Sequence, residues 1–159
     1  MEEYQVTIDG KTYPLQSPFM VLATQNPIEQ EGTYRLPEAQ LDRFLFKVNV
    51  DYPSLDEEKA ILHRFKDNYH SKNPLDEIEA ILSAEQINES RSIVEKVYIH
   101  NSLVDYIAAI VNDTRHNGDL YLGASPRASL AMLKSAKAFA ALAGRDFVIP
   151  EDIKFAAYP

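Results

Sequence analysis

Short apolar runs separated by turn residues dominate the first part of the chain, a pattern typical of β-strands. Residues 5–13 predict a β-hairpin, because an Asp-Gly pair at their centre favours a two-residue turn. Residues 19–24 are almost wholly apolar, as expected of a central parallel strand covered on both faces. A further strand is expected at residues 44–50, and a short helix around residues 38–44.

After residue 52 the apolar residues recur at helical spacing. Capping and first-turn signals predict five helices, which begin near Ser54, Ser83, Asn101, Ser125 and Ile149. Two apolar stripes are expected to lie in the core of a helical bundle: Ile61, Leu62 and Phe65, and Leu103, Ile107 and Val111. The helix that begins at Ser125 is rich in alanine and is expected to end at Gly144.

The chain therefore divides into a strand-rich part, residues 1–52, and a helical part, residues 53–159. A few strands with one or two helices cannot cover both faces of a parallel strand. The fold class expected is an α/β fragment followed by an all-α domain, with the first part belonging to the end of a larger α/β domain.

Composition excludes several classes of function. The 159 residues include no cysteine, and the four histidines are scattered, so a disulfide framework and a zinc site are not expected. A net charge of −8 argues against a general nucleic-acid or anionic-membrane binder. The sequence has no apolar run of membrane-spanning length and no signal peptide, which predicts a cytoplasmic protein.

Gly10, Lys11 and Thr12 resemble the end of a phosphate-binding P-loop. That loop requires a glycine five positions earlier, where this chain has Gln5, and a helix afterwards, where a strand is expected. The hairpin turn accounts for Gly10. No other segment matches the P-loop pattern, so this chain lacks the parts that usually grip nucleotide and magnesium.

Two polar residues of the first part could act on phosphate. Asn26 follows the expected strand, and the carboxyl ends of strands are where open α/β sheets bind ligands. Arg43 lies on the short helix, and an arginine donated into a neighbouring site can stabilise phosphoryl transfer. Each has a purely structural alternative: Asn26 also suits a turn before Pro27, and Arg43 a surface ion pair with Asp42 or Glu38.

Arg127 is the third candidate. Ser125 suits the N-cap and Pro126 the first position of a helix, so Arg127 projects from the first turn, where free N–H groups attract anions. A positive side chain opposes the helix dipole there, which is expected if the arginine meets a phosphate. The alternative is a salt bridge to a nearby carboxylate.

Four segments carry a family resemblance: Ala-Thr-Gln-Asn-Pro at residues 23–27, Glu-Gly-Thr-Tyr at 31–34, Leu-Pro-Glu-Ala-Gln-Leu-Asp-Arg-Phe at 36–44, and Gly-Ala-Ser-Pro-Arg at 123–127. In order and spacing they resemble the MoxR family of AAA+ ATPases, although Arg35 stands where that family usually has proline.

The resemblance implies a role for each candidate. Asn26 corresponds to sensor 1, Arg43 to an arginine finger that acts in trans on the adjacent subunit, and Arg127 to sensor 2, which contacts ATP phosphate. It further implies that residues 1–52 are the late part of an AAA+ core, with the hairpin, the sensor 1 strand and the last core strand. Residues 53–159 would be the helical lid.

The resemblance also implies a hexameric ring that uses ATP and Mg²⁺ to remodel or mature protein clients, among them von Willebrand A-type domain proteins. Without Walker A and Walker B segments, the 159-residue chain by itself is expected to be inactive and to bind no cofactor tightly. Two alternatives remain open: a non-enzymatic interaction module and a DNA-associated ring ATPase.

Overall fold

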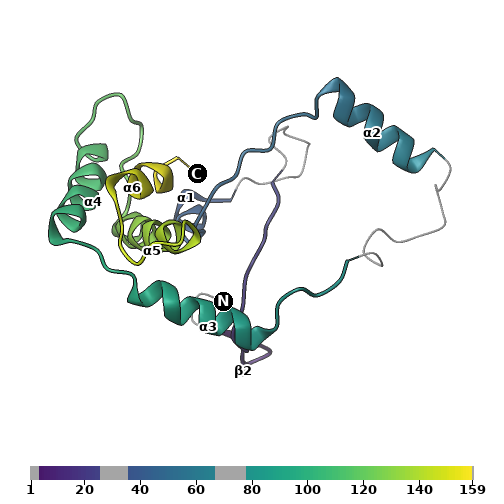
Figure 1. The fold of residues 1–159 in the computed structure, drawn as a ribbon, viewed down its shortest axis with the longest axis horizontal. Coiled ribbons are helices and arrows are strands. Elements are labelled where there is room, and N and C mark those ends of the chain that lie inside the picture. Colours follow the sequence, from purple (N-terminus) through teal and green to yellow (C-terminus); the bar gives the residue numbers. More distant parts are fainter. Residues whose placement is uncertain (1–3, 26–35, 67–77, 159) are drawn as a thin grey trace. The chain divides into compact units, whose positions relative to one another are not determined.

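The computed structural model describes residues 4–25, 36–66 and 78–158 (Figure 1). The chain divides into two compact units, one made of Met1–Lys47 with Ala84–Pro159 and the other of Val48–Ser83. No helix among the described residues has both the length and the apolar character needed to cross a membrane.

The predicted hairpin is present. Strands β1 (Gln5–Ile8) and β2 (Lys11–Pro14) pair antiparallel, with Gln5 opposite Pro14 and Ile8 opposite Lys11. Asp9 and Gly10 have φ values of 48° and 76°, and positive φ at both central residues is what a type I′ hairpin turn requires.

The expected strands at residues 19–24 and 44–50 are not formed, so this part of the prediction is wrong for the described structure. Most of these residues are exposed, and Leu22 is 88% exposed. A strand exists only where a neighbour accepts its ladder of hydrogen bonds. Neither segment has such a neighbour among the described residues, where the hairpin is the only sheet.

Helix α1 (Glu38–Leu41) is shorter than the predicted helix at 38–44, because the next residues tighten into a turn. The backbone N–H of Arg43 donates to Gln40 O at 3.3 Å, and that of Phe44 to Leu41 O at 3.0 Å. These contacts span three residues rather than four, as in the last turn of many helices.

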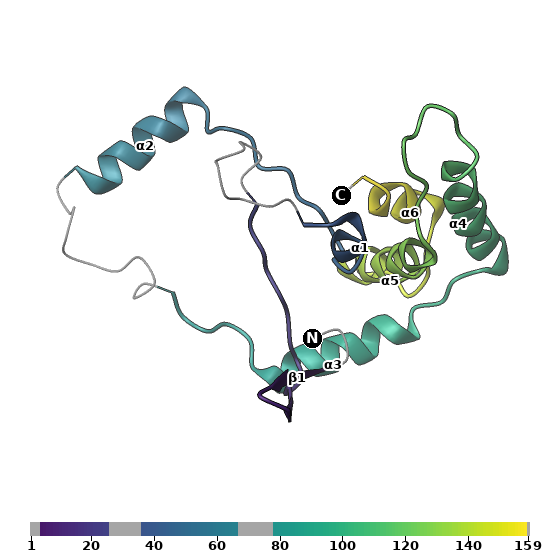
Figure 2. The same ribbon diagram turned by 180° about the vertical axis from the view of Figure 1, so that it is seen from behind.

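The larger unit is built around helices α3 (Ala84–Lys96), α4 (Asn101–Thr114), α5 (Pro126–Leu142) and α6 (Pro150–Ala156). Helices α6 and α4 both pack against α5 (Figures 1 and 2). The buried apolar core consists of Val97, Ile107, Val111, Met132, Ala136, Ala140, Val148 and Ile153. Ala136 and Ala140 are fully buried, and their small side chains allow Ile153 of α6 to approach α5.

The predicted helix starts are largely confirmed. Ser125 caps α5, and Gly144 follows its end with a φ of 73°. Helix α4 begins at Asn101 as expected, but Asn101 does not cap it as its sequence suggested: His100 is the N-cap, and its Nδ1 accepts from the Ser102 N–H at 3.2 Å. The α4 stripe is confirmed as core, with Ile107 and Val111 buried and Leu103 packed beside them.

Helix α2 (Leu55–Phe65) lies in the smaller unit. Its start is as predicted: the Glu57 carboxylate accepts from the Ser54 hydroxyl at 2.6 Å and from the Ser54 N–H at 2.7 Å, which lowers the pKa of Glu57. Its apolar stripe, however, has no buried member, and Leu62 is 69% exposed, so the expected bundle core is wrong here. The described residues of this unit contain no second helix to cover it.

An ion pair between Arg145 and Asp152 stabilises the start of α6. The Arg145 guanidinium donates to both Asp152 carboxylate oxygens, at 2.8 and 2.6 Å, and Asp152 also accepts from the Ile149 N–H at 2.9 Å. Asp152 is 6% exposed. The hydrogen bonds from Arg145, followed by the one from Ile149, hold the pKa of Asp152 below its usual value against the opposing effect of burial.

We predict that Asp152→Asn lowers the free energy of unfolding by roughly 2 kcal/mol at pH 7, and that this difference disappears in acid. A carboxyl with a lowered folded-state pKa contributes stability above its unfolded pKa of about 3.9 and loses it as the pH falls through the folded pKa. Urea unfolding at several pH values, followed by circular dichroism, measures this. Asp146→Asn removes a nearby exposed carboxylate and is the matched control, which should keep the stability of the wild type at pH 7.

Candidate functional site

Of the three residues predicted to act on phosphate, the structure describes two. Asn26 lies outside the described residues. Arg43 and Arg127 are both described, and both are exposed. They lie on two elements that meet, the end of α1 and the start of α5.

Arg43 lies on the tight turn that follows α1. The N–H of Asp42 donates to Glu38 O at 2.9 Å, and the next two N–H groups continue the turn as described above. Three successive backbone hydrogen bonds therefore fix Asp42 and Arg43 relative to each other. The Arg43 side chain therefore projects from a backbone turn with little conformational freedom.

Arg127 lies in the first turn of α5, as predicted. The Ser125 hydroxyl accepts from the Arg127 N–H at 3.0 Å, which satisfies one of the free N–H groups of the helix start. Pro126 occupies the first turn, where a missing N–H costs nothing. The remaining N–H groups and the dipole make this end of a 17-residue helix attractive to anions.

The loop before α5 is fastened to the end of α4. The Ala124 N–H donates to Thr114 Oγ1 at 2.9 Å, and Arg115 Nε donates to Ala124 O at 2.8 Å. A Cβ on Gly123 would lie 2.7 Å from the Arg115 Cα atom, so only glycine fits there. These positioning residues were not found from the sequence, although a glycine two residues before an N-cap was an available signal.

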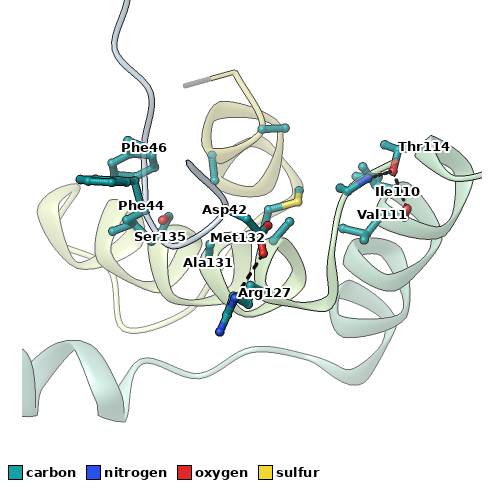
Figure 3. A pocket seen from close by; sticks show the side chains of 15 residues that line it. Asp42, Phe44, Phe46, Ile110, Val111, Thr114, Arg127, Ala131, Met132 and Ser135 are labelled. Atoms are coloured by element: carbon teal, nitrogen blue, oxygen red, sulfur yellow. Dashed lines mark hydrogen bonds and ion pairs between the residues drawn. The ribbon is translucent and has the colours of Figure 1, made fainter. Parts of the chain in front are cut away.

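Asp42 joins the two elements (Figure 3). The Ser125 hydroxyl donates to Asp42 Oδ1 at 2.7 Å, and Arg127 Nη1 lies 3.5 Å from Asp42 Oδ2. The alternative expected for Arg127, a salt bridge to a carboxylate, is therefore present. The sequence had suggested Asp42 only as a partner for Arg43, and its link to residues more than 80 positions away was missed.

A cavity of about 250 Å³ adjoins this link. Phe44 and Phe46 line one side, Met132 and Ser135 of α5 line another, and Asp42 and Arg127 also contribute to its wall (Figure 3). The Ser135 hydroxyl is buried and has no hydrogen-bond partner among the described residues. The cavity is thus mostly apolar, with charged groups from both elements in its lining.

Known protein families match both the segment that contains α1 and the segment that contains α5. Residues 1–46 match the family described as "ATPase family associated with various cellular activities (AAA)", and residues 112–159 match the AAA lid domain. Arg43 lies in the first match and Arg127 in the second. Together the two matched segments define part of an AAA+ ATPase.

Relatives narrow the family. The chain is 46% identical over 99% of its length to "Uncharacterized protein YeaC" of Bacillus subtilis, of which it covers 48%. It is 44% identical over 96% of its length to "Chaperone MoxR1" of Mycobacterium tuberculosis, of which it covers 41%. A crystal structure of a "putative ATPase" from Cytophaga hutchinsonii is 42% identical and matches with a TM-score of 0.84, over 99% of this chain and 49% of that one.

The chain belongs to the MoxR family of AAA+ ATPases. It spans about half the length of the curated relatives it matches. The fold class predicted from the sequence, a partial AAA+ core followed by a helical lid, is confirmed by the two family matches and by the similar crystal structure.

We predict that Ser125→Ala lowers the free energy of unfolding by about 1 kcal/mol, because it removes both the N-cap of α5 and a hydrogen bond to Asp42. Urea denaturation gives the value. Ser129→Ala makes the same change one turn later in α5, where alanine favours the helix, and should cost nothing. Equal stability of the two variants would show that Ser125 does not fasten the helix start.

Proposed function

We propose that this chain is the late core and lid of an ATPase that couples ATP binding and hydrolysis to remodelling or maturation of partner proteins. In this proposal Asn26 is sensor 1, Arg43 is an arginine finger for the neighbouring subunit, and Arg127 is sensor 2 on the subunit's own nucleotide. ATP and Mg²⁺ would be held mainly by a part of the intact protein that this chain does not cover.

One observation carries the proposal: the structure brings the turn that bears Arg43 against the helix start that bears Arg127. Arginine is always charged and can donate two parallel hydrogen bonds, so it suits phosphate well. At the start of α5 the N–H groups and dipole would reinforce an anion that Arg127 also binds. A fixed positive charge that meets the developing charge of phosphoryl transfer lowers the barrier.

Assembly follows from the assignment of Arg43. A finger that acts on an adjacent subunit needs a head-to-tail interface, and such interfaces form a ring where the rotation between neighbouring subunits closes. We therefore propose a ring, and from the family resemblance a hexamer. The proposed chaperone role rests on the relative named as a chaperone. We also propose, from the family resemblance, that the clients are von Willebrand A-type domain proteins. A cytoplasmic location and a domain boundary at residues 52–53 are proposals as well.

We predict that Arg43→Ala in the full-length protein lowers kcat by about 10³-fold or more while leaving ATP affinity nearly unchanged. Asn26→Ala should slow the chemical step. The sharper measurement mixes the two variants. A complete interface needs Asn26 from the subunit that binds the nucleotide and Arg43 from its neighbour. In a mixed ring this occurs where an Arg43→Ala subunit, which keeps Asn26, receives Arg43 from an Asn26→Ala subunit. With equal amounts and random assembly, about a quarter of the interfaces are complete, so ATPase activity should return on mixing.

Lys47→Ala is the control for this experiment, because it removes a nearby exposed positive charge and should retain normal turnover. A mixture as inactive as its components would rule out an arginine finger acting in trans at Arg43. Normal turnover in either single variant would remove that residue from the mechanism.

We also predict that the purified 159-residue chain does not hydrolyse ATP, because it holds no P-loop to grip the phosphates. Phosphate release should equal that of its own Arg43→Ala, Arg127→Ala double variant prepared in the same way, which reports contaminating ATPases. Turnover clearly above that double variant would contradict the proposed division of the active site.

A further inference from the structure

Asp42 touches one candidate arginine and directly precedes the other. We propose that Asp42 is a positioning residue that competes with nucleotide phosphate for Arg127, so that phosphate must displace the Asp42 carboxylate to engage the lid. The inference rests on the proposed function, in which Arg127 contacts phosphate. It adds that the Arg127 guanidinium has a second binding partner, the Asp42 carboxylate.

The chemistry of the two occupants is alike. Carboxylate and phosphate oxygens both accept hydrogen bonds from guanidinium, and both carry negative charge, so they compete when they approach the same side of Arg127. The pair with Asp42 is loose, at 3.5 Å, and its side chains are 48% and 33% exposed. A partly exposed ion pair of this kind is weak enough for a doubly charged phosphate to replace.

The geometry lets Arg127 move while Asp42 stays. The Arg127 backbone is fixed by the Ser125 cap, at 3.0 Å, so only the flexible side chain has to swing. Asp42 keeps the hydrogen bond from the Ser125 hydroxyl, at 2.7 Å, when the guanidinium leaves. The carboxylate is therefore not stranded without a partner, which keeps the exchange inexpensive.

The exchange also reaches the finger. Asp42 and Arg43 share one hydrogen-bonded turn. A change in the interactions of the Asp42 carboxylate therefore acts on the backbone that positions Arg43. In the proposed ring, Arg127 reports the subunit's own nucleotide and Arg43 acts on the neighbour's. Asp42 is the group through which the first can influence the second.

The test uses Asp42→Asn in the full-length protein. Asparagine keeps an oxygen that accepts from Ser125 but loses the charge that attracts Arg127. With a non-hydrolysable ATP analogue and Mg²⁺, calorimetry should show binding about two- to fivefold tighter than in the wild type, the size expected for loss of a weak ion pair. A damaged fold would weaken binding, so a gain in affinity separates competition from a structural role.

Glu38→Gln is the matched control, because it removes the same charge from the exposed face of α1 and should leave affinity unchanged. The decisive comparison repeats Asp42→Asn in an Arg127→Ala background, where the gain should vanish. Asp42→Ser provides a second neutral variant if Asp42→Asn folds poorly, and the same gain is expected of it.

The outcomes separate the two proposals. If Arg127→Ala leaves affinity unchanged, Arg127 does not contact phosphate and the proposed function of that residue fails. If Arg127→Ala weakens binding but neutral variants at Asp42 bind no more tightly than the wild type, the competition proposal alone is overturned. A gain that persists in the Arg127→Ala background, or that Glu38→Gln reproduces, also overturns it, because it would come from general electrostatics.

Discussion

The structure of the candidate site depends on one carboxylate. Asp42 accepts from the Ser125 hydroxyl and pairs with Arg127, and this link holds the end of α1 against the start of α5. Both candidate arginines of the described residues are positioned by it, Arg127 through its side chain and Arg43 through the adjoining backbone. The link also joins the two segments that match separate AAA families, the core and the lid.

The charge arrangement at the start of α5 explains why a carboxylate belongs there. A cation in the first turn of a helix is opposed by the free N–H groups and the helix dipole. Asp42 offsets this unfavourable placement without entering the helix. A phosphate would offset it more completely, since it carries more charge and can also reach the N–H groups. Asp42 therefore balances charge at the start of α5 in this structure, and in the proposed function a phosphate takes over that role.

Local features were predictable from the sequence, and distant contacts were not. An Asp-Gly pair specifies its hairpin and Ser125-Pro126 specifies a helix start, because only neighbouring residues decide them. Residues 19–24 and 44–50 have the composition of strands, yet a strand also needs a partner, and the described residues supply none. The Asp42 link was invisible because nothing local indicates which carboxylate, 83 positions from Ser125, will meet it. Asn26, Arg43 and Arg127 became specific candidates only through the family motifs that surround them.

The central claim is that Arg127 and Arg43 serve two different triphosphates. A structure of the full-length ring with a non-hydrolysable ATP analogue and Mg²⁺ tests it most directly. The account predicts an Arg127 nitrogen about 2.7–3.0 Å from a phosphate oxygen of the same subunit and turned away from Asp42, with Arg43 reaching the phosphate of the adjacent subunit. An Arg127 still paired with Asp42 beside a bound nucleotide, and an Arg43 directed away from every phosphate, would contradict it.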